Sequence, residues 1–174
     1  SFCNTQLLAV SRQAFFDLGM LQDPTGGWPN WDDVDFGYRA HLGGYRLLKC
    51  GKAQGTHWDA SLSSLKHTCQ RWYRASKSAV SLFKHHPGLP PFLPMFYDKT
   101  PIDWRGDSPY LIARKMARRM ASNKIPIFLM EHVVSMFEKI YPSPKILLSF
   151  YRWIQGGYMS MGYFAGLKEV GKIP

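Results

Sequence analysis

The sequence predicts a globular unit followed by a mainly α-helical tail, and three observations lead to this prediction. The 174 residues are 45% hydrophobic, which is enough to bury a core and argues against disorder. Six of the 12 prolines fall between residues 87 and 109 and mark a connection. Residues 1–70 contain six Lys and Arg and six Asp and Glu, whereas residues 71–174 contain 16 Lys and Arg and six Asp and Glu. The whole net charge of +10 therefore lies in the second part of the chain.

The first predicted helix runs from about Trp31 to Leu42. Asn30 is a candidate N-cap, and Gly43-Gly44 provides the stop. Asp35 and Arg39 are four residues apart on this helix, so their side chains can form an ion pair. Asp35 is therefore expected to have a structural role.

Asp32 and Asp33 form the strongest candidate functional pair. With Asp35 they place three carboxylates within four residues, and such groups repel one another unless they share a metal, a cation or a proton. The first turn of a helix directs both side chains out of the helix end. Acidic residues there also complement the helix dipole, and the pattern alone favours this simpler explanation.

The remaining segments follow in order. Residues 87–109 exclude a long helix or a central strand and predict an ordered linker onto which aromatic residues pack. Residues 110–121 separate apolar from basic side chains, as in a helix on an anionic membrane or on its own domain. Residues 125–141 are apolar but interrupted by Pro and charge. Residues 146–166 approach transmembrane length, yet their glycines and polar residues favour an interfacial segment over a span.

The sequence lacks the signatures of several enzyme classes. The three cysteines have no metal-ligand spacing and predict free thiols. The sequence contains no Gly-rich phosphate loop and no Ser-His-Asp signature. The acidic segment is therefore the main candidate for a catalytic site in this sequence.

Three segments in the right order resemble family 2 glycosyltransferases of the GT-A fold. Trp31 to Arg39, continued by Ala40 to Leu47, resembles the acidic segment and the Ala-Gly-Tyr-Arg run of that family. Leu8 to Met20 is similar to the strand and Arg-x-x-Phe element that precedes it, although Met20 onward departs from the usual ending. Ala53 to His57 falls where the family often places a strand ending in His. Together these matches span about Phe2 to His86.

The resemblance implies an α/β fold and a division of the chain. Residues 1–86 would be the acceptor-side half of a partial GT-A domain, and residues 87–109 the connection. Residues 110–174 would form basic amphipathic and interfacial helices that face a membrane. The donor half would lie upstream of residue 1, so the chain is expected to be the carboxyl-terminal part of a longer enzyme and inactive as a fragment.

Carried over by position, the resemblance makes Asp33 the general base of an inverting transferase. Asp33 would take the proton from an acceptor hydroxyl as its oxygen attacks the anomeric carbon of a nucleotide-sugar. Asp32 would orient the acceptor or the loop. Trp28, Trp31 and Arg39 would bind the acceptor, although a Trp is more often a core anchor with its N–H satisfied.

The donor side is implied more weakly. His57 is similar to a histidine that helps to hold a divalent metal or the diphosphate. The alternative is a histidine at the end of a strand whose ring is hydrogen-bonded to the backbone. The metal would be Mn or Mg, with its main ligands upstream of residue 1. Arg71 and Arg74 belong to a basic segment that could neutralise the departing diphosphate, meet anionic lipid or simply be solvated.

The implied protein is a membrane-associated hexosyltransferase of cell-surface polysaccharide synthesis. It would act on a glycan or lipid-linked hydroxyl at the cytoplasmic side of the membrane, peripherally or interfacially anchored, without nucleic acid. Two alternatives stay open. One is a non-catalytic basic membrane-surface module, in which the acids only cap a helix. The other is a nucleic-acid-binding module, suggested by a pI near 9.7 although no reading motif is present.

Overall fold

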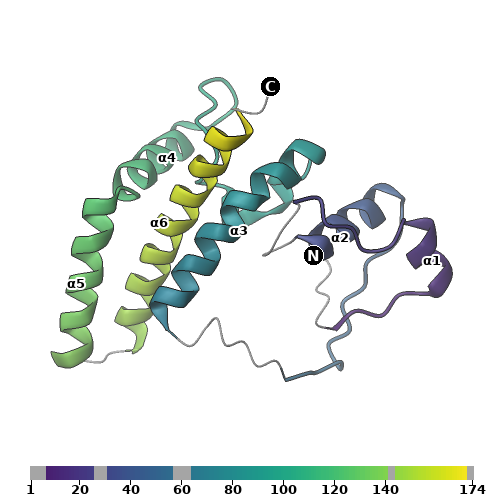
Figure 1. Cartoon of the computed structure of the whole chain (residues 1–174), viewed down its shortest axis with the longest axis horizontal. Coiled ribbons are helices and arrows are strands. Elements are labelled where there is room, and N and C mark those ends of the chain that lie inside the picture. Colours follow the sequence, from purple (N-terminus) through teal and green to yellow (C-terminus); the bar gives the residue numbers. More distant parts are fainter. Residues whose placement is uncertain (1–6, 26–30, 57–63, 141–143, 172–174) are drawn as a thin grey trace.

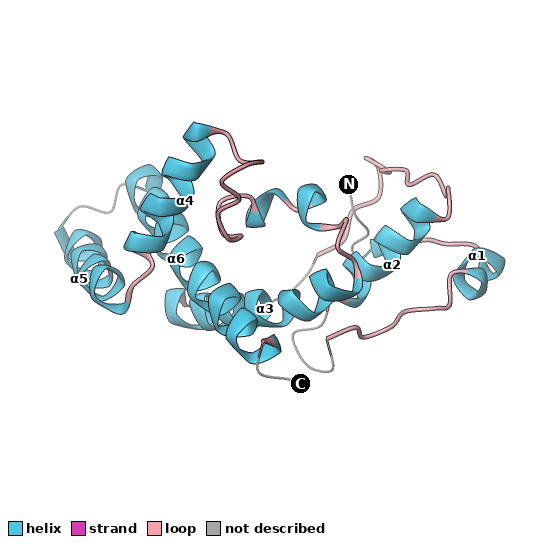
Figure 2. Ribbon diagram, turned by 90° about the horizontal axis from the view of Figure 1, so that it is seen from above, coloured by secondary structure: helices cyan, strands magenta, loops and turns pink. Residues whose placement is uncertain are grey.

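The structure is a computed structural model of the 174-residue chain, and it describes residues 7–25, 31–56, 64–140 and 144–171. Within these ranges every regular element is helical (Figures 1 and 2). The α-helices are α1 (Arg12–Asp17), α2 (Asp32–Leu42), α3 (Leu65–His85), α4 (Pro109–Ala121), α5 (Lys124–Ile140) and α6 (Pro144–Val170). The 3-10 turns are η3 (Pro90–Phe92) and η4 (Pro94–Phe96).

The predicted α/β fold is wrong for the described residues, because they contain no β-strand. The segment around Leu8 to Val10, expected as a strand, is irregular and exposed. Residues 53–56, expected to lead into a second strand, are also irregular and exposed. A strand is stable only when a neighbour completes its hydrogen bonds, and neither segment pairs with another segment in the described part of the chain.

The centre of the molecule is the pair formed by α3 and α6 (Figure 1). Glycines on α6 allow the two backbones to approach closely. A Cβ on Gly162 would lie 2.1 Å from the carbonyl oxygen of Tyr73, and one on Gly166 would lie 2.4 Å from that of Lys77. These glycines are four residues apart and so share one face of α6. The glycines in residues 146–166 therefore serve helix packing.

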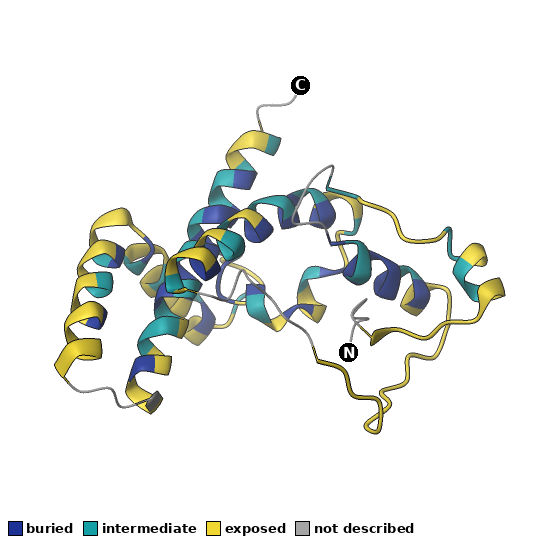
Figure 3. Ribbon diagram, turned by 60° about the horizontal axis from the view of Figure 1, so that its bottom comes forward, coloured by how far each residue is buried: buried dark blue, intermediate teal, exposed yellow. Residues whose placement is uncertain are grey.

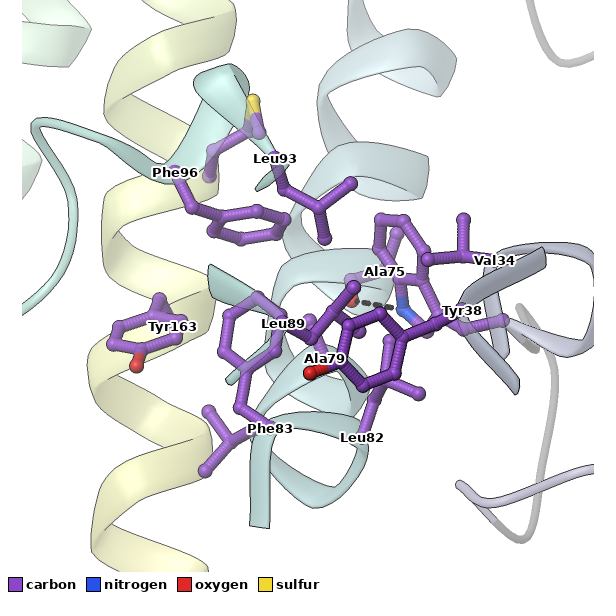
Figure 4. Packing of buried hydrophobic residues seen from close by; sticks show 13 residues of the cluster. Val34, Tyr38, Ala75, Ala79, Leu82, Phe83, Leu89, Leu93, Phe96 and Tyr163 are labelled. Atoms are coloured by element: carbon purple, nitrogen blue, oxygen red, sulfur yellow. Dashed lines mark hydrogen bonds between the residues drawn. The ribbon is translucent and has the colours of Figure 1, made fainter. Parts of the chain in front are cut away.

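Two apolar clusters flank this pair. The larger one joins α2, α3, the η3–η4 segment and α6, and Figure 4 shows Phe96 lying over Phe83 and Tyr163 near its centre. The smaller one joins α3, α5 and α6 around Cys69 and Ile154. α4 and α5 lie beside α6, while α1 and α2 lie on the other side of α3 (Figure 1).

The other expectations for single elements have different outcomes. The helix expected over residues 31–42 is confirmed by α2, which ends at Gly43, with Gly44 in the left-handed region at φ 75°. The expected N-cap Asn30 lies outside the described residues. The linker over residues 87–109 contains no long helix, as expected, and buries Phe96. Residues 146–166, expected to be interfacial, belong to α6, which packs between α3 and α5, and their contact with a membrane stays a prediction.

Candidate active site

The acidic pair lies at the start of α2, where Asp32 and Asp33 are both half-buried. The backbone N–H of Asp33 donates to Oδ1 of Asp32 at 3.0 Å, and that of Val34 donates to Oδ1 of Asp33 at 2.8 Å. Trp31, the N-cap residue, provides no side-chain cap. The two carboxylates therefore satisfy the first amide groups of α2 and place negative charge at the positive end of its dipole.

Trp31 fixes this end of α2 to α3. Its indole Nε1 donates to the carbonyl oxygen of Ala75 at 2.9 Å and lies 3.2 Å from the hydroxyl of Ser78. The ring is 8% exposed and packs 5.9 Å from the ring of Phe96, measured between centroids. A buried indole whose N–H is satisfied holds its neighbours in one place. Asp32 and Asp33 thus start from a fixed backbone.

A buried ion cluster fixes the other side of α2. The carboxylate of Asp35 accepts from Arg39 at 2.8 Å and lies 2.7 Å from Nε2 of His86, at the end of α3. Arg39 also donates to the carbonyl oxygens of Leu18 and Met20, which ties the turn after α1 to α2. The expected pairing of Asp35 with Arg39 is confirmed.

These contacts change the roles expected for two acceptor-binding residues. Trp31 is part of the core and presents no open ring face to a sugar, so its predicted stacking is not supported. The guanidinium of Arg39 is committed to one carboxylate and two carbonyl oxygens. Arg39 therefore positions α2, and the direct acceptor contact expected of it does not fit this bonding.

The described residues contain no ligand set for the expected metal. Nowhere in them do three or more His, Cys, Asp or Glu side chains gather as metal ligands. His57 and Trp28 lie outside the described residues. The acidic pair alone does not make a divalent site, because Mn and Mg need more ligands than two adjacent carboxylates.

Arg71 and Arg74 lie on α3, and Arg74 lines a pocket of about 610 Å³ between α3, α5 and α6. Its lining residues are Gln70, Tyr73, Arg74, Lys124, Ile127, Phe128, Glu131, Tyr158 and Met161. Arg74 is thus grouped with Lys124 of α5 and not with the residues that hold the acidic pair. Its predicted role at a diphosphate stays a prediction.

One wall of this pocket carries a coupled acid and phenol. The hydroxyl of Tyr158 donates to Glu131 at 3.0 Å. Burial, this hydrogen bond and the charge of Glu131 raise the pKa of Tyr158 to about 12. Burial, assisted by the same carboxylate, raises the pKa of the nearby Cys69 thiol to about 12. Both groups stay protonated at neutral pH, so neither acts as a base or a thiolate nucleophile there.

A second charged cluster surrounds the buried Asp98. Lys99 donates to its Oδ1 at 2.6 Å, and Arg114 donates to its Oδ2 at 3.0 Å, with Arg118 also in reach. Burial acts to raise the pKa of Asp98, but the Lys99 hydrogen bond and the surrounding cations outweigh it and lower the pKa to about 2. This cluster joins the linker to α4.

Sequence reasoning did not single out His86, Asp98 or Glu131. The partner of His86 is 51 residues away, so no local spacing could reveal it. Asp98 stands in a Pro-rich segment, where a lone acid has no periodic signal. Glu131 and Tyr158 are on helices whose mutual position depends on the packing of α6. A charge inside an apolar run, as at Glu131, was the one available sign of a buried partner.

Comparison with known proteins gave no match to a protein-family model, a curated protein or a solved structure. In the part of the chain that the structure describes, none of the helices combines the length and the apolar character needed to cross a bilayer.

Proposed function

We propose that this chain carries the catalytic acids of an inverting glycosyltransferase similar to family 2, with Asp33 as the general base. The observation that supports this most is the acidic pair at a helix end held from two sides. Trp31 ties that end to α3, and Asp35 ties the helix to Arg39 and His86. A general base must be held within hydrogen-bonding reach of the proton that it takes, and a rigid helix end meets this requirement.

The proposed step transfers one sugar with inversion. The acceptor hydroxyl gives its proton to Asp33 while its oxygen forms a bond to the anomeric carbon of a nucleotide-sugar. The bond from that carbon to the nucleoside diphosphate breaks, and the diphosphate leaves with the electron pair. The base must lie on the face of the sugar opposite the leaving group, because attack and departure are in line. Asp32 orients Asp33 through the Asp33 amide.

The donor side of the proposal rests on the resemblance rather than on a site in this structure. A nucleotide-sugar would need cations or a metal at its diphosphate. Arg71 and Arg74 are the proposed local cations, and a divalent metal would depend on ligands elsewhere in the protein. A glycan or lipid-linked acceptor and a cytoplasmic membrane face likewise remain proposals, as does the exclusion of nucleic acid.

The test compares Asp33→Asn with the unmutated protein, in the natural protein that contains this chain. Sugar transfer is measured at saturating nucleotide-sugar and Mn, together with donor affinity. We expect Asp33→Asn to lower kcat by about a hundredfold or more, because the amide cannot accept the proton, while donor affinity is unchanged.

The matched control is Asp32→Asn, which removes an equal charge from the adjacent position. It should lower transfer much less than Asp33→Asn, since the introduced amide side chain can still accept from the backbone N–H of Asp33. Equal rates for Asp33→Asn and the unmutated protein would show that Asp33 is not the base. An absence of transfer and of donor binding in the unmutated protein would favour the non-catalytic membrane module.

A further inference from the structure

α5 has apolar residues on two opposite faces. Ile127 and Val134, seven residues apart, are buried against α3 and α6. On the other side a stripe of four side chains is 58–74% exposed. These residues, here called the outer face of α5, are Ile125, Leu129, Met136 and Ile140. Their spacing of four, seven and four places them on one side of a helix.

The rest of the helix surface extends this apolar stripe. Phe128, Val133 and Phe137 lie beside it and are also exposed. His132 is the polar residue within the stripe, and its ring packs 4.1 Å from that of Phe128 between centroids. Figure 3 shows α5 at the edge of the molecule with most of its ribbon coloured as exposed. A contiguous apolar surface of this kind marks an interaction site on a stable protein.

The charged side chains around the outer face of α5 are mainly positive. Residues 110–174 contain ten Lys and Arg but only three acids, all of them Glu. Glu131 and Glu138 accept from the hydroxyls of Tyr158 and Tyr151 on α6, which turns both acids away from the outer face. The third, Glu169, pairs with Lys77 of α3 at 2.6 Å.

Cations, in contrast, remain exposed along and next to α5. Lys139 stands near the end of α5, and Lys145 follows at the start of α6, whereas Lys124 lines the pocket between α3, α5 and α6. An apolar stripe with cations at its borders and acids turned inward matches the arrangement of a helix that lies in an anionic membrane interface. A neutral or basic protein partner would not match these cations.

We infer that the outer face of α5 docks on an anionic lipid bilayer, with the helix lying in the plane of the interface. The aliphatic and Met side chains enter the acyl boundary, while Lys139 and Lys145 meet lipid phosphates. This inference narrows the expectation that residues 110–174 face a membrane to one face of one helix. It does not rest on the proposed transferase activity, because no residue of the acidic pair takes part.

The test is co-sedimentation with vesicles of phosphatidylcholine, with and without phosphatidylglycerol. We expect binding to the anionic vesicles and weaker binding to the neutral ones. The variant Leu129→Asp/Met136→Asp should bind anionic vesicles at least about tenfold more weakly, because two charges would enter the apolar boundary. The control Leu48→Asp changes a side chain that is 76% exposed outside α5, and it should bind like the unmutated protein.

A second variant keeps the outer face apolar. Lys139→Gln should weaken binding to anionic vesicles about fivefold and leave binding to neutral vesicles unchanged. Thermal midpoints equal to that of the unmutated protein show that the variants fold. The inference is overturned if the unmutated protein binds neither vesicle, or if Leu129→Asp/Met136→Asp binds as well as it does. Self-association that this double variant abolishes, without vesicle binding, would assign the face to a second copy of the chain.

Discussion

At the scale of single residues, Asp35 decides how the acidic pair is held. Its side chain is 4% exposed, forms an ion pair with Arg39, whose Nη2 lies 2.6 Å from Oδ2, and is hydrogen-bonded to Nε2 of His86 at 2.7 Å. Arg39 in turn binds the backbone after α1. One buried carboxylate thereby joins α1, α2 and the end of α3, and its loss would leave two polar partners without compensation.

We therefore expect Asp35→Ala to lower the free energy of unfolding by about 3 kcal/mol, the cost typical of breaking a buried pair. Urea denaturation followed by circular dichroism measures this loss. Asp32→Ala is the matched control, because Asp32 is half-buried at the helix end, and it should cost about 1 kcal/mol. Equal losses for the two variants would contradict a special role for Asp35.

The ionisation of Asp98 makes the free energy of unfolding depend on pH in the acid range. Its pKa is about 2 in the folded protein and 3.8 in the unfolded chain, so the unfolded chain binds the proton first as pH falls. The stabilisation is complete above about pH 4 and is lost as pH falls toward 2, by about 2 kcal/mol in total. The Asp98→Asn variant, although less stable at neutral pH, should show a smaller loss between pH 4 and 2. Parallel pH profiles of unfolding free energy would contradict this assignment.

At the scale of helices, the contact of α3 with α6 depends on glycine. A Cβ at Gly166 would lie 2.4 Å from the carbonyl oxygen of Lys77 and 2.9 Å from Cγ2 of Val80. The backbone of α3 cannot yield as a flexible side chain would. The two helices would have to move apart, and the apolar contacts along them would loosen.

Gly166→Ala should lower the free energy of unfolding by about 2 kcal/mol, since overpacking exceeds the gain in helix propensity. Gly51→Ala is its control, because a Cβ at Gly51 meets nothing within 4 Å. Thermal and urea unfolding of both variants measure the difference. A stabilised Gly166→Ala protein would mean that α3 and α6 lie farther apart than described.

The helices also show where sequence reasoning succeeds. α2 was predictable because its acidic first turn, its i to i+4 pair and its Gly stop are all local signals. The expected strands were not, since a strand depends on a distant partner that these residues do not find. In α6 the pair Gly156-Gly157 interrupts an apolar run of the sequence, and only the approach of α3 shows that Gly162 and Gly166 form a packing surface. Of the candidate site, the acidic pair could be located, whereas the roles of Trp31 and Arg39 required the tertiary contacts.

At the scale of the whole molecule, two thiols report on the integrity of the core. Cys69 is 1% exposed between α3, α5 and α6, and burial with the charge of Glu131 raises its pKa to about 12. Cys50 is exposed. Reaction of Cys69 thus requires that the thiol become exposed.

In a Cys3→Ser background, a thiol reagent at pH 8 should modify Cys50 rapidly and Cys69 only as the protein unfolds. The rate at Cys69 should rise in urea in step with the circular dichroism signal, and Gly166→Ala should raise it further. Mass spectrometry of the labelled peptides separates the two sites. Rapid labelling of Cys69 in the native protein would contradict the packing of α5 and α6 on α3.

The whole molecule also separates two surfaces. The acidic pair lies at the start of α2 on one side of α3, and the outer face of α5 lies beyond α6 on the other (Figure 1). Charge follows the same division, because the excess of Lys and Arg lies beyond residue 70. Variants at one surface should therefore leave the other unaffected, and effects at sites this far apart should be additive.

Azide distinguishes a general base at Asp33 from a carboxylate with only a structural role. Azide is already a nucleophile and needs no proton removed, so Asp33→Gly in the natural protein should transfer the sugar to azide within a few-fold of the unmutated rate. Transfer to a hydroxyl acceptor should fall about a hundredfold in the same variant. An inverted glycosyl azide, identified by its anomeric proton coupling in NMR, is the predicted product. A parallel loss of both transfers would contradict the base assignment and give Asp33 a structural role at the start of α2.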